Sequence, residues 1–84
     1  MTLAELGDQE KVIGIKQVTK AVTKGVATCV FTANDADERV LASLMRLCTE
    51  KGIAVVHVPT MKELGRACAI EVGAAAAACV ASQR

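Results

Sequence analysis

Lysines recur at every fourth position between residues 16 and 24, and this spacing makes them the first candidates for binding chemistry. At about 100° per residue in an α-helix, Lys16, Lys20 and Lys24 fall within one sector roughly 80° wide. No acidic residue lies four positions from any of them, although such partners often stabilise an exposed helix. The stripe is either an ordinary solvated helix face or a surface for an anionic partner.

The charge distribution favours the second interpretation. The net charge is only +1, but residues 11–24 hold four lysines and no acid. A local basic patch on a near-neutral chain suits a compact anionic partner better than a general polyanion. Phe31 is the only Phe, Tyr or Trp residue, which argues against a protein that stacks single-stranded bases on aromatic rings.

Acidic residues and a histidine are the candidates for catalysis: Asp35, Asp37, Glu38 and His57. Paired carboxylates can do acid–base or metal chemistry. These three acids, however, stand where a helix is expected to begin, and capping and the helix dipole explain them there. His57 lies on an expected strand without a sequence neighbour that would suggest a triad, so a structural role is favoured. The sequence predicts that the chain is not an enzyme.

Cysteines and glycines give no sign of a metal or cofactor. The four cysteines, Cys29, Cys48, Cys68 and Cys79, lie at least 11 residues apart, whereas zinc sites need closely spaced pairs. Reduced core thiols in a cytoplasmic protein are the favoured reading. The glycines match neither a dinucleotide fingerprint nor a phosphate-binding loop. We therefore expect no cofactor, no metal and no small-molecule substrate.

Length and hydropathy predict one cytoplasmic domain spanning residues 1–84. Apolar residues make up 52% of the chain, many of them alanine, so a closely packed aliphatic core is expected. The apolar run at 72–81 has about half of the roughly 20 residues that a membrane helix needs. The N-terminus does not resemble a signal peptide, and no membrane partner is expected.

Periodicity and end signals predict an alternation of helices and strands. Helices are expected at 2–8, 16–24, 37–51 and 60–69, with Thr2 and Glu5 or Thr60 and Glu63 as capping boxes. Strands are expected at 28–33 and 54–58, after a short apolar stretch at 12–15. Residues 70–82 are ambiguous between helix and strand, and we favour a parallel-type strand from Ala74.

Two further patterns concern the packing of these elements. Helix, Lys-Gly and strand follow one another twice, at Gly25 and at Gly52, as in βα units that wind a sheet with helices on both faces. Methionines Met45 and Met61 are read as core. The helix at 37–51 carries an apolar stripe made of Val40, Leu41, Leu44, Met45, Leu47 and Cys48.

Three segments together resemble one protein family. They are Gly14-Ile-Lys-Gln-Val-Thr-Lys20-Ala-Val-Thr-Lys-Gly25, Phe31-Thr-Ala-Asn-Asp35-Ala-Asp37 and Lys62-Glu-Leu-Gly65-Arg-Ala-Cys-Ala-Ile70-Glu-Val-Gly-Ala-Ala. In this order they resemble the L7Ae/L30e family of ribosomal proteins, which bind kink-turn RNA, and especially its short bacterial members. The resemblance implies an α/β fold, a three-layer α-β-α sandwich with a mixed sheet of about four strands.

The resemblance also implies an RNA-binding site around a sharply bent duplex with tandem sheared G·A pairs. Gly14, Lys16, Gln17 and Lys20 would lie in the RNA groove at the bend, and the stripe adds Lys24. Further contacts would follow along the chain. Asp37 and Leu41 would approach a flipped-out nucleotide, Lys62 would reach the backbone, and the loop Ile70, Glu71, Val72 and Gly73 would pack on the same bulge.

Three positions depart from the family pattern. Lys16 and Gln17 stand where the family has Asn and Glu, which read the G·A pairs. The amide of Gln17 can both accept and donate hydrogen bonds, so it is a workable substitute. Lys16 brings a point charge that favours phosphate or guanine acceptors. Gly73 replaces the usual proline and should loosen the unbound loop.

The sequence thus predicts a non-catalytic, monomeric domain that recognises a structured RNA, a kink-turn of ribosomal or regulatory RNA, and that is ribosome-associated. Two alternatives remain open at this point. One is a protein-interaction module that uses the same lysine face and apolar loop. The other is an enzyme built on Asp35, Asp37 or His57.

Overall fold

The computed structural model describes residues 6–7 and 9–81, which form seven helices and strands. In chain order they are β1 (Lys11–Ile13), α1 (Ile15–Thr23), β2 (Ala27–Ala33), α2 (Glu38–Lys51), β3 (Ala54–Val58), α3 (Met61–Ala67) and β4 (Ala76–Val80). Every element expected from residue 12 onward is confirmed, with ends shifted by one or two residues. The helix expected at 2–8 and its capping box fall mostly outside the described residues.

The four strands form one mixed sheet in the order β1-β4-β2-β3. Strand β2 runs parallel to β3, whereas β4 runs antiparallel to both β1 and β2. The mixed four-stranded sheet is confirmed, but the expectation that the last strand is parallel is wrong. The seven residues of α3 span only about 10 Å, and Ala74 N–H donates to the Met61 carbonyl at the start of that helix. The chain therefore re-enters the sheet at the end it left and must run back.

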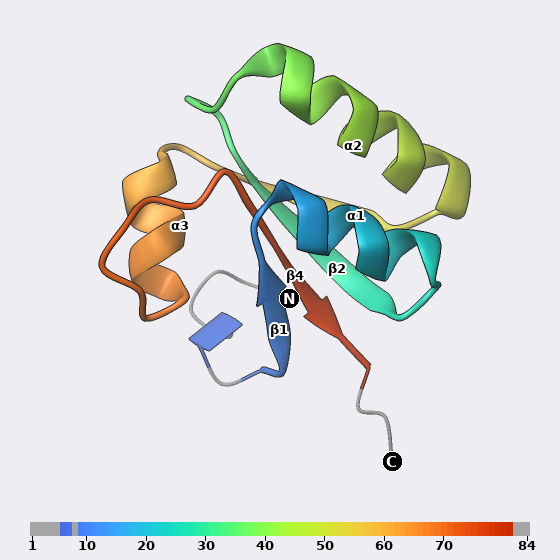
Figure 1. Ribbon diagram of the computed structural model, residues 1–84, viewed down its shortest axis with the longest axis horizontal. Coiled ribbons are helices and arrows are strands. Elements are labelled where there is room, and N and C mark those ends of the chain that lie inside the picture. The colour runs from blue at the N-terminus through green and yellow to red at the C-terminus, as the bar shows by residue number, and fades with distance from the viewer. Residues whose placement is uncertain (1–5, 8, 82–84) are drawn as a thin grey trace.

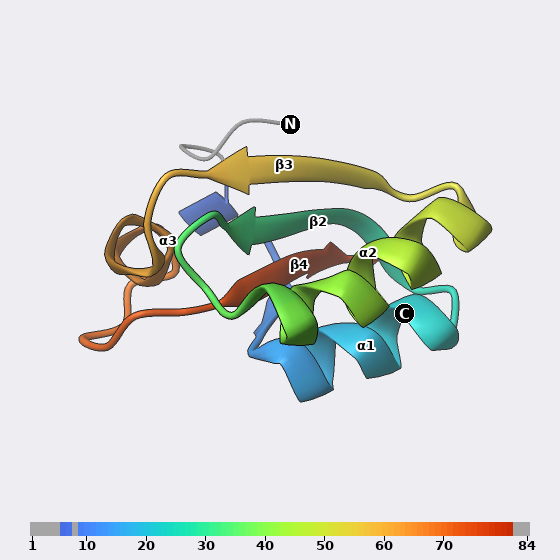
Figure 2. The ribbon, with the colours of Figure 1, turned by 90° about the horizontal axis from the view of Figure 1, so that it is seen from above.

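Helices cover both faces of the sheet, as the three-layer prediction requires (Figures 1 and 2). Helices α1 and α2 lie side by side on one face, where Val18, Val22 and Leu44 pack on Val30. Helix α3 covers the other face near one end of the sheet, where Leu64 belongs to a core cluster around Phe31. Strand β4 lies in the middle with its alanines 76–78 fully buried, and small side chains let the layers approach closely.

Each of the two long helices ends at the residue expected to stop it. Gly25 has φ of +77° after α1, and Gly52 has φ of +69° after α2, a conformation that glycine adopts without steric cost. The stripe of α2 is confirmed at Leu44 and Cys48, which are buried. Its first member is an exception, because Val40 is 42% exposed. The fold thus leaves one large apolar side chain of α2 uncovered near its N-terminus.

The cysteines and the histidine take the structural positions expected of them. All four cysteines are buried thiols, and burial raises the pKa of each, which keeps them protonated and poorly reactive at neutral pH. His57 is exposed, and its Nδ1 lies 3.2 Å from the hydroxyl of Thr32 on the adjacent strand. Within residues 6–7 and 9–81, no helix has the length and apolar character to cross a membrane.

Candidate nucleic-acid interface

Strand direction brings distant segments together at one end of the sheet. Because β1 and β2 are both antiparallel to β4, and β3 is parallel to β2, strands β1, β2 and β3 all point the same way. Their carboxyl ends therefore meet at the end where β4 begins, on the left in Figure 2. The segments found there are Gly14, Asn34–Asp37, Pro59–Lys62 and Ile70–Gly73. This end of the sheet is called the loop end below.

Hydrogen bonds fix the segments of the loop end to one another. Gly14 N–H donates to the Ala76 carbonyl at 2.9 Å, which joins the start of α1 to β4. Asn34 N–H donates to the Val58 carbonyl at 2.8 Å, which joins β2 to β3. Ala74 N–H donates to the Met61 carbonyl at 3.0 Å, so the last loop is joined to α3. The loop end is therefore a connected unit and not a set of independent loops.

The two aspartates of the loop end each cap a different helix. Asp37 accepts from Arg39 N–H at 2.9 Å and starts α2, as expected. Asp35 instead accepts from Met61 N–H at 2.7 Å, 26 residues away, and thereby ties the β2–α2 loop to the start of α3. Each carboxylate thus stabilises the start of a helix, the structural role that the sequence favours for these acids.

Gly65 allows the last loop to pack directly against α3. A Cβ atom at this position would collide with the carbonyl oxygen of Val72 and would approach the Cα of Gly73 to 3.2 Å. A glycine inside a helix costs about 1 kcal/mol relative to alanine, so its presence calls for a compensating contact. The compensating contact is the close packing of the loop 70–73, whose backbone occupies the space that a side chain at residue 65 would fill.

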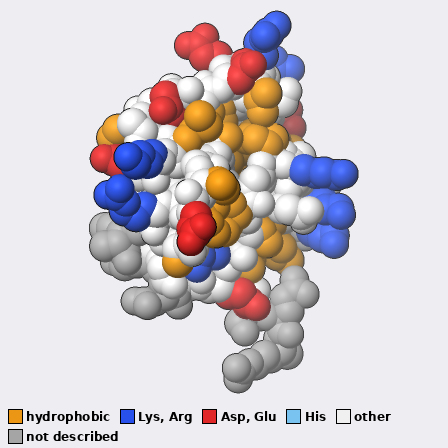
Figure 3. Space-filling view, turned by 60° about the vertical axis from the view of Figure 1, so that its left-hand side comes forward, with side chains coloured by type: hydrophobic (Ala, Val, Ile, Leu, Met, Phe, Trp, Pro, Cys, Tyr) orange, Lys and Arg blue, Asp and Glu red, His pale blue; other side chains and the backbone are white. Residues whose placement is uncertain are grey.

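The apolar side chains of the loop end differ in exposure. Val72 is 70% exposed. Ile70, Leu41 and Met61 are half-buried and pack on the core cluster around Phe31. Of the two aliphatic residues in this loop, only Val72 therefore offers its side chain fully to a partner. In Figure 3, which looks toward this end, hydrophobic side chains run down the middle and Lys and Arg side chains project on both sides.

Gly14 leads from the loop end into α1 and keeps the approach to that helix open. Its φ of +99° strongly favours glycine, and a Cβ built there would meet nothing within 4 Å. Helix α1 starts at the next residue without a side-chain cap. Gly14 thus serves the turn itself and leaves the space beside it accessible to a partner.

The lysine stripe of α1 lies on its exposed side, as predicted. Lys16, Lys20 and Lys24 are exposed, as is Gln17. The opposite side of the helix, with Val18, Ala21 and Val22, is buried. In the part of the chain that the structure describes, the only salt bridge joins Arg39 to Asp37, so the stripe has no acidic partner there.

The structure does not bring every predicted site residue to one place. Lys16 and Gln17 lie at the N-terminal turn of α1 beside the loop end. Lys24 closes the other end of this helix, which spans about 13 Å. Lys62 is exposed on the first turn of α3, on the opposite side of the loop end. The predicted site is thus a compact apolar region at the loop end, extended by the row of lysines along α1.

Asp35 and Gly65 are the two residues of this region that sequence reasoning did not single out for their roles. The position of Asp35 predicts a cap for the helix that follows it, whereas its hydrogen bond to Met61, 26 residues away, leaves no local signal in the sequence. Gly65 did leave a signal, since a glycine in the interior of an expected helix indicates a close backbone approach.

Comparison with known proteins assigns the chain to a family. Residues 4–84 match the model of the ribosomal protein L7Ae/L30e/S12e/Gadd45 family. The chain belongs to this family. It is 46% identical over 82 residues to RNA-binding protein TTE2299 of Caldanaerobacter subterraneus, a match that covers 98% of this chain and all of the relative. It is also 49% identical over 70 residues to large ribosomal subunit protein eL8 of Halobacterium salinarum, covering 82% of this chain and 58% of the relative.

A solved structure agrees with the family assignment. The Giardia lamblia 15.5kD RNA binding protein superposes with a TM-score of 0.85 at 28% identity, over 96% of this chain and 69% of that chain. The family fold that the sequence resemblance implied, with helices on both faces of a four-stranded mixed sheet, is therefore confirmed.

Proposed function

We propose that this chain is a non-catalytic RNA-binding protein that recognises and stabilises kink-turn RNA. The observation that carries the proposal is the connected loop end, where an exposed apolar side chain lies between two basic regions and next to an open helix start. A sharply bent RNA offers complementary features, because its bulge exposes a base and its two arms present phosphates on either side.

Each part of the surface has a role in this proposal. Val72 would pack on the extruded nucleotide of the bulge, with half-buried Leu41 and Ile70 behind it. Lys62 on one side and Lys20 on the other would each reach a phosphate of a different arm. Since the loop end is held by backbone hydrogen bonds before RNA arrives, little ordering would be needed on binding, which favours affinity.

The start of α1 would read the G·A pairs at the bend. Gln17 is exposed beside Gly14, where RNA can approach the backbone closely. Its amide can accept a guanine N–H and donate to a ring nitrogen of adenine. Lys16 would add charge near the same groove and bind phosphate or the guanine acceptors O6 and N7. We therefore expect Gln17 to contribute specificity and Lys16 to contribute mainly affinity.

The names of the relatives support RNA as the partner and suggest where it is found. One relative is named an RNA-binding protein and another a large ribosomal subunit protein. We propose that the chain acts as a monomer in the cytoplasm, on ribosomal or regulatory RNA. The mechanism would be a shift of the RNA population toward its bent state, and no bond would be made or broken.

Binding to a kink-turn RNA and to two matched controls tests this function. The controls are the same RNA with its G·A pairs replaced by Watson–Crick pairs, and a duplex without the bulge. The expected result is binding to the kink-turn at least about tenfold tighter than to either control at 150 mM salt, a difference of about 1.4 kcal/mol. Equal affinity for the three RNAs would contradict the proposal, and absence of binding to all would favour a protein partner for the lysine face.

A further inference from the structure

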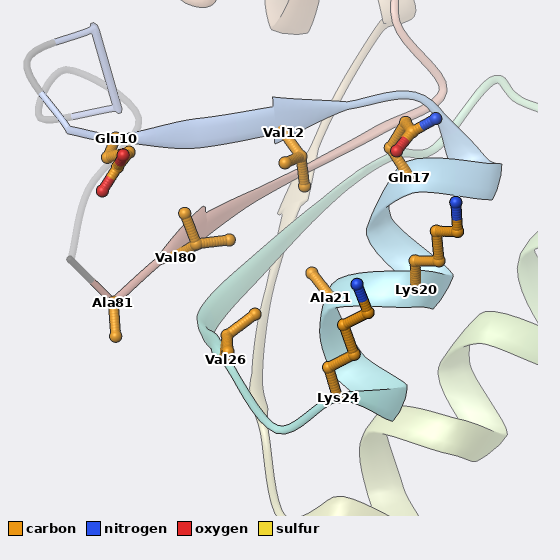
Figure 4. Close-up of a pocket in the computed structure, with 9 residues that line it drawn as sticks. All are labelled: Glu10, Val12, Gln17, Lys20, Ala21, Lys24, Val26, Val80 and Ala81. Carbon is orange, nitrogen blue, oxygen red and sulfur yellow. The ribbon is translucent and has the colours of Figure 1, made fainter. Parts of the chain in front are cut away.

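A hollow of about 340 Å³ lies between α1 and the ends of β1 and β4, outside the loop end. Its floor is made of half-buried valines from three different segments, Val12, Val26 and Val80. Figure 4 shows these side chains between Glu10 on one side and the polar residues of α1 on the other. Pockets for small molecules start at about 300 Å³ and combine apolar walls with a few polar groups, as this hollow does.

The polar groups around the valines have opposite chemical character at the two sides. On the α1 side the hollow is lined by Gln17, Lys20 and Lys24, which supply two positive charges and an amide. On the far side Glu10 supplies a carboxylate. In the described part of the chain neither lysine forms a salt bridge with Glu10, and the side chain of Glu10 accepts no hydrogen bond. These groups remain available to a ligand.

We propose that this hollow binds a single guanine nucleotide. The flat base would lie on the three valines, and its phosphate would lie against Lys20 and Lys24. Guanine carries two parallel N–H donors, N1–H and N2–H, that a carboxylate accepts together. Glu10 would accept them, whereas adenine and cytosine offer only one amine to the same group. No glycine-rich phosphate loop is involved, so the site would take a monophosphate in an open groove.

Two sources could supply such a nucleotide. Gln17 and Lys20 also belong to the proposed RNA face, so the hollow continues that face and could hold an unpaired guanine next to the kink-turn. A free guanine nucleotide presents the same chemistry. The inference rests on the hollow itself, and its test with GMP alone does not depend on whether the protein recognises a kink-turn.

The test is a titration of the methyl-labelled protein with GMP, followed by NMR of the valine methyl groups. GMP should shift the signals of Val12, Val26 and Val80 with a dissociation constant of about 1 mM or lower, and AMP should bind about tenfold more weakly. Unmoved methyl signals at about 10 mM GMP would overturn the proposal.

Substitutions at two exposed residues test the roles of the carboxylate and the lysines without disturbing the core. Glu10→Gln should abolish the preference for GMP over AMP, because an amide offers one acceptor oxygen where the carboxylate offers two for the parallel N–H groups. Lys24→Gln should weaken both nucleotides about equally. The matched controls are Glu63→Gln and Lys51→Gln, which alter exposed residues outside the hollow and should change neither affinity. A preference for GMP that survives Glu10→Gln would refute the assignment of guanine.

A competition experiment identifies the source of the nucleotide. If a kink-turn RNA with an unpaired flanking guanine shifts the same valine signals and displaces GMP, the RNA itself fills the hollow. If GMP and the RNA bind together, the site serves a free nucleotide. A kink-turn that binds tightly while GMP leaves the valines unshifted would refute this site and leave the proposed function intact.

Discussion

The loop end and the lysine stripe of α1 form the two parts of the proposed interface, and they are constructed in opposite ways. Backbone hydrogen bonds of 2.8–3.0 Å join the segments of the loop end, and most of its apolar side chains pack on the core. The lysines carry their charges on long side chains that bond to nothing in the described residues. The first part can select a shape because it is fixed before binding. The second supplies attraction that depends on salt and little on geometry.

Loss of the close packing between α3 and the loop 70–73 should have the largest effect on RNA binding. In Gly65→Ala the new methyl group collides with the Val72 carbonyl, so the loop 70–73 must move away from α3. We expect a loss of about 1–3 kcal/mol in stability and a larger relative loss of kink-turn binding than any single lysine substitution causes. Urea unfolding and RNA titration measure the two effects.

Gly7→Ala is the matched control, because a Cβ there meets only one atom within 4 Å, at an ordinary 3.5 Å. It should leave RNA binding unchanged. Full affinity for the kink-turn in Gly65→Ala would show that the position of this loop does not matter for binding.

The next effect concerns specificity at the start of α1. Gln17→Ala should cost about 1–3 kcal/mol on the kink-turn and much less on a plain duplex, because it removes hydrogen bonds to base edges. Lys16→Ala should weaken both RNAs to a similar extent, because it removes charge. Affinities of the two variants for both RNAs check this directly. Equal losses on both RNAs for Gln17→Ala would remove this residue from recognition.

A smaller effect is expected from the exposed side chain of the loop. Val72→Ser should lower affinity for the kink-turn by about 1 kcal/mol and leave stability nearly unchanged, since the side chain is 70% exposed in the unbound protein. Ile70→Ser is the comparison, because Ile70 packs on the core and should lose about 1–3 kcal/mol of stability. Melting curves and RNA titrations separate the two. Unfolding of Val72→Ser would show that Val72 is core.

The smallest change should come from a single lysine of the stripe. Lys20→Ala should make the slope of log affinity against log salt shallower by about one unit, the amount expected for one phosphate contact. Lys51→Ala is the control, because Lys51 is exposed at the end of α2 that lies away from the loop end. A slope unaltered by Lys20→Ala would place Lys20 outside the interface.

The two parts also differ in how well the sequence predicts them. The lysine stripe was predictable because its residues lie within one helix, where a period of 3.6 fixes the face. Most helix and strand positions follow from equally local patterns, including the cap at Asp37 and the stop at Gly52. The resemblance to the family added the mixed sheet and the roles proposed for the loop residues.

The loop end was harder to predict because its contacts join residues far apart in the chain. The direction of β4 depends on Ala74 returning to Met61, and no periodicity within residues 70–82 contains that information. The bond from Met61 to Asp35 spans 26 residues. The exposure of Val40 depends on how α2 lies over the sheet, so the stripe in its sequence did not reveal it.

The most direct test of the central claim is whether the protein bends the RNA as it binds. A kink-turn RNA with fluorescent dyes on its two arms reports the angle between them by energy transfer, in a buffer without divalent cations. We predict that one equivalent of protein raises the transfer efficiency to that of the bent form, and that Gly65→Ala gives a smaller rise at saturation. Binding without any rise in transfer would contradict the claim that this chain stabilises the bent state.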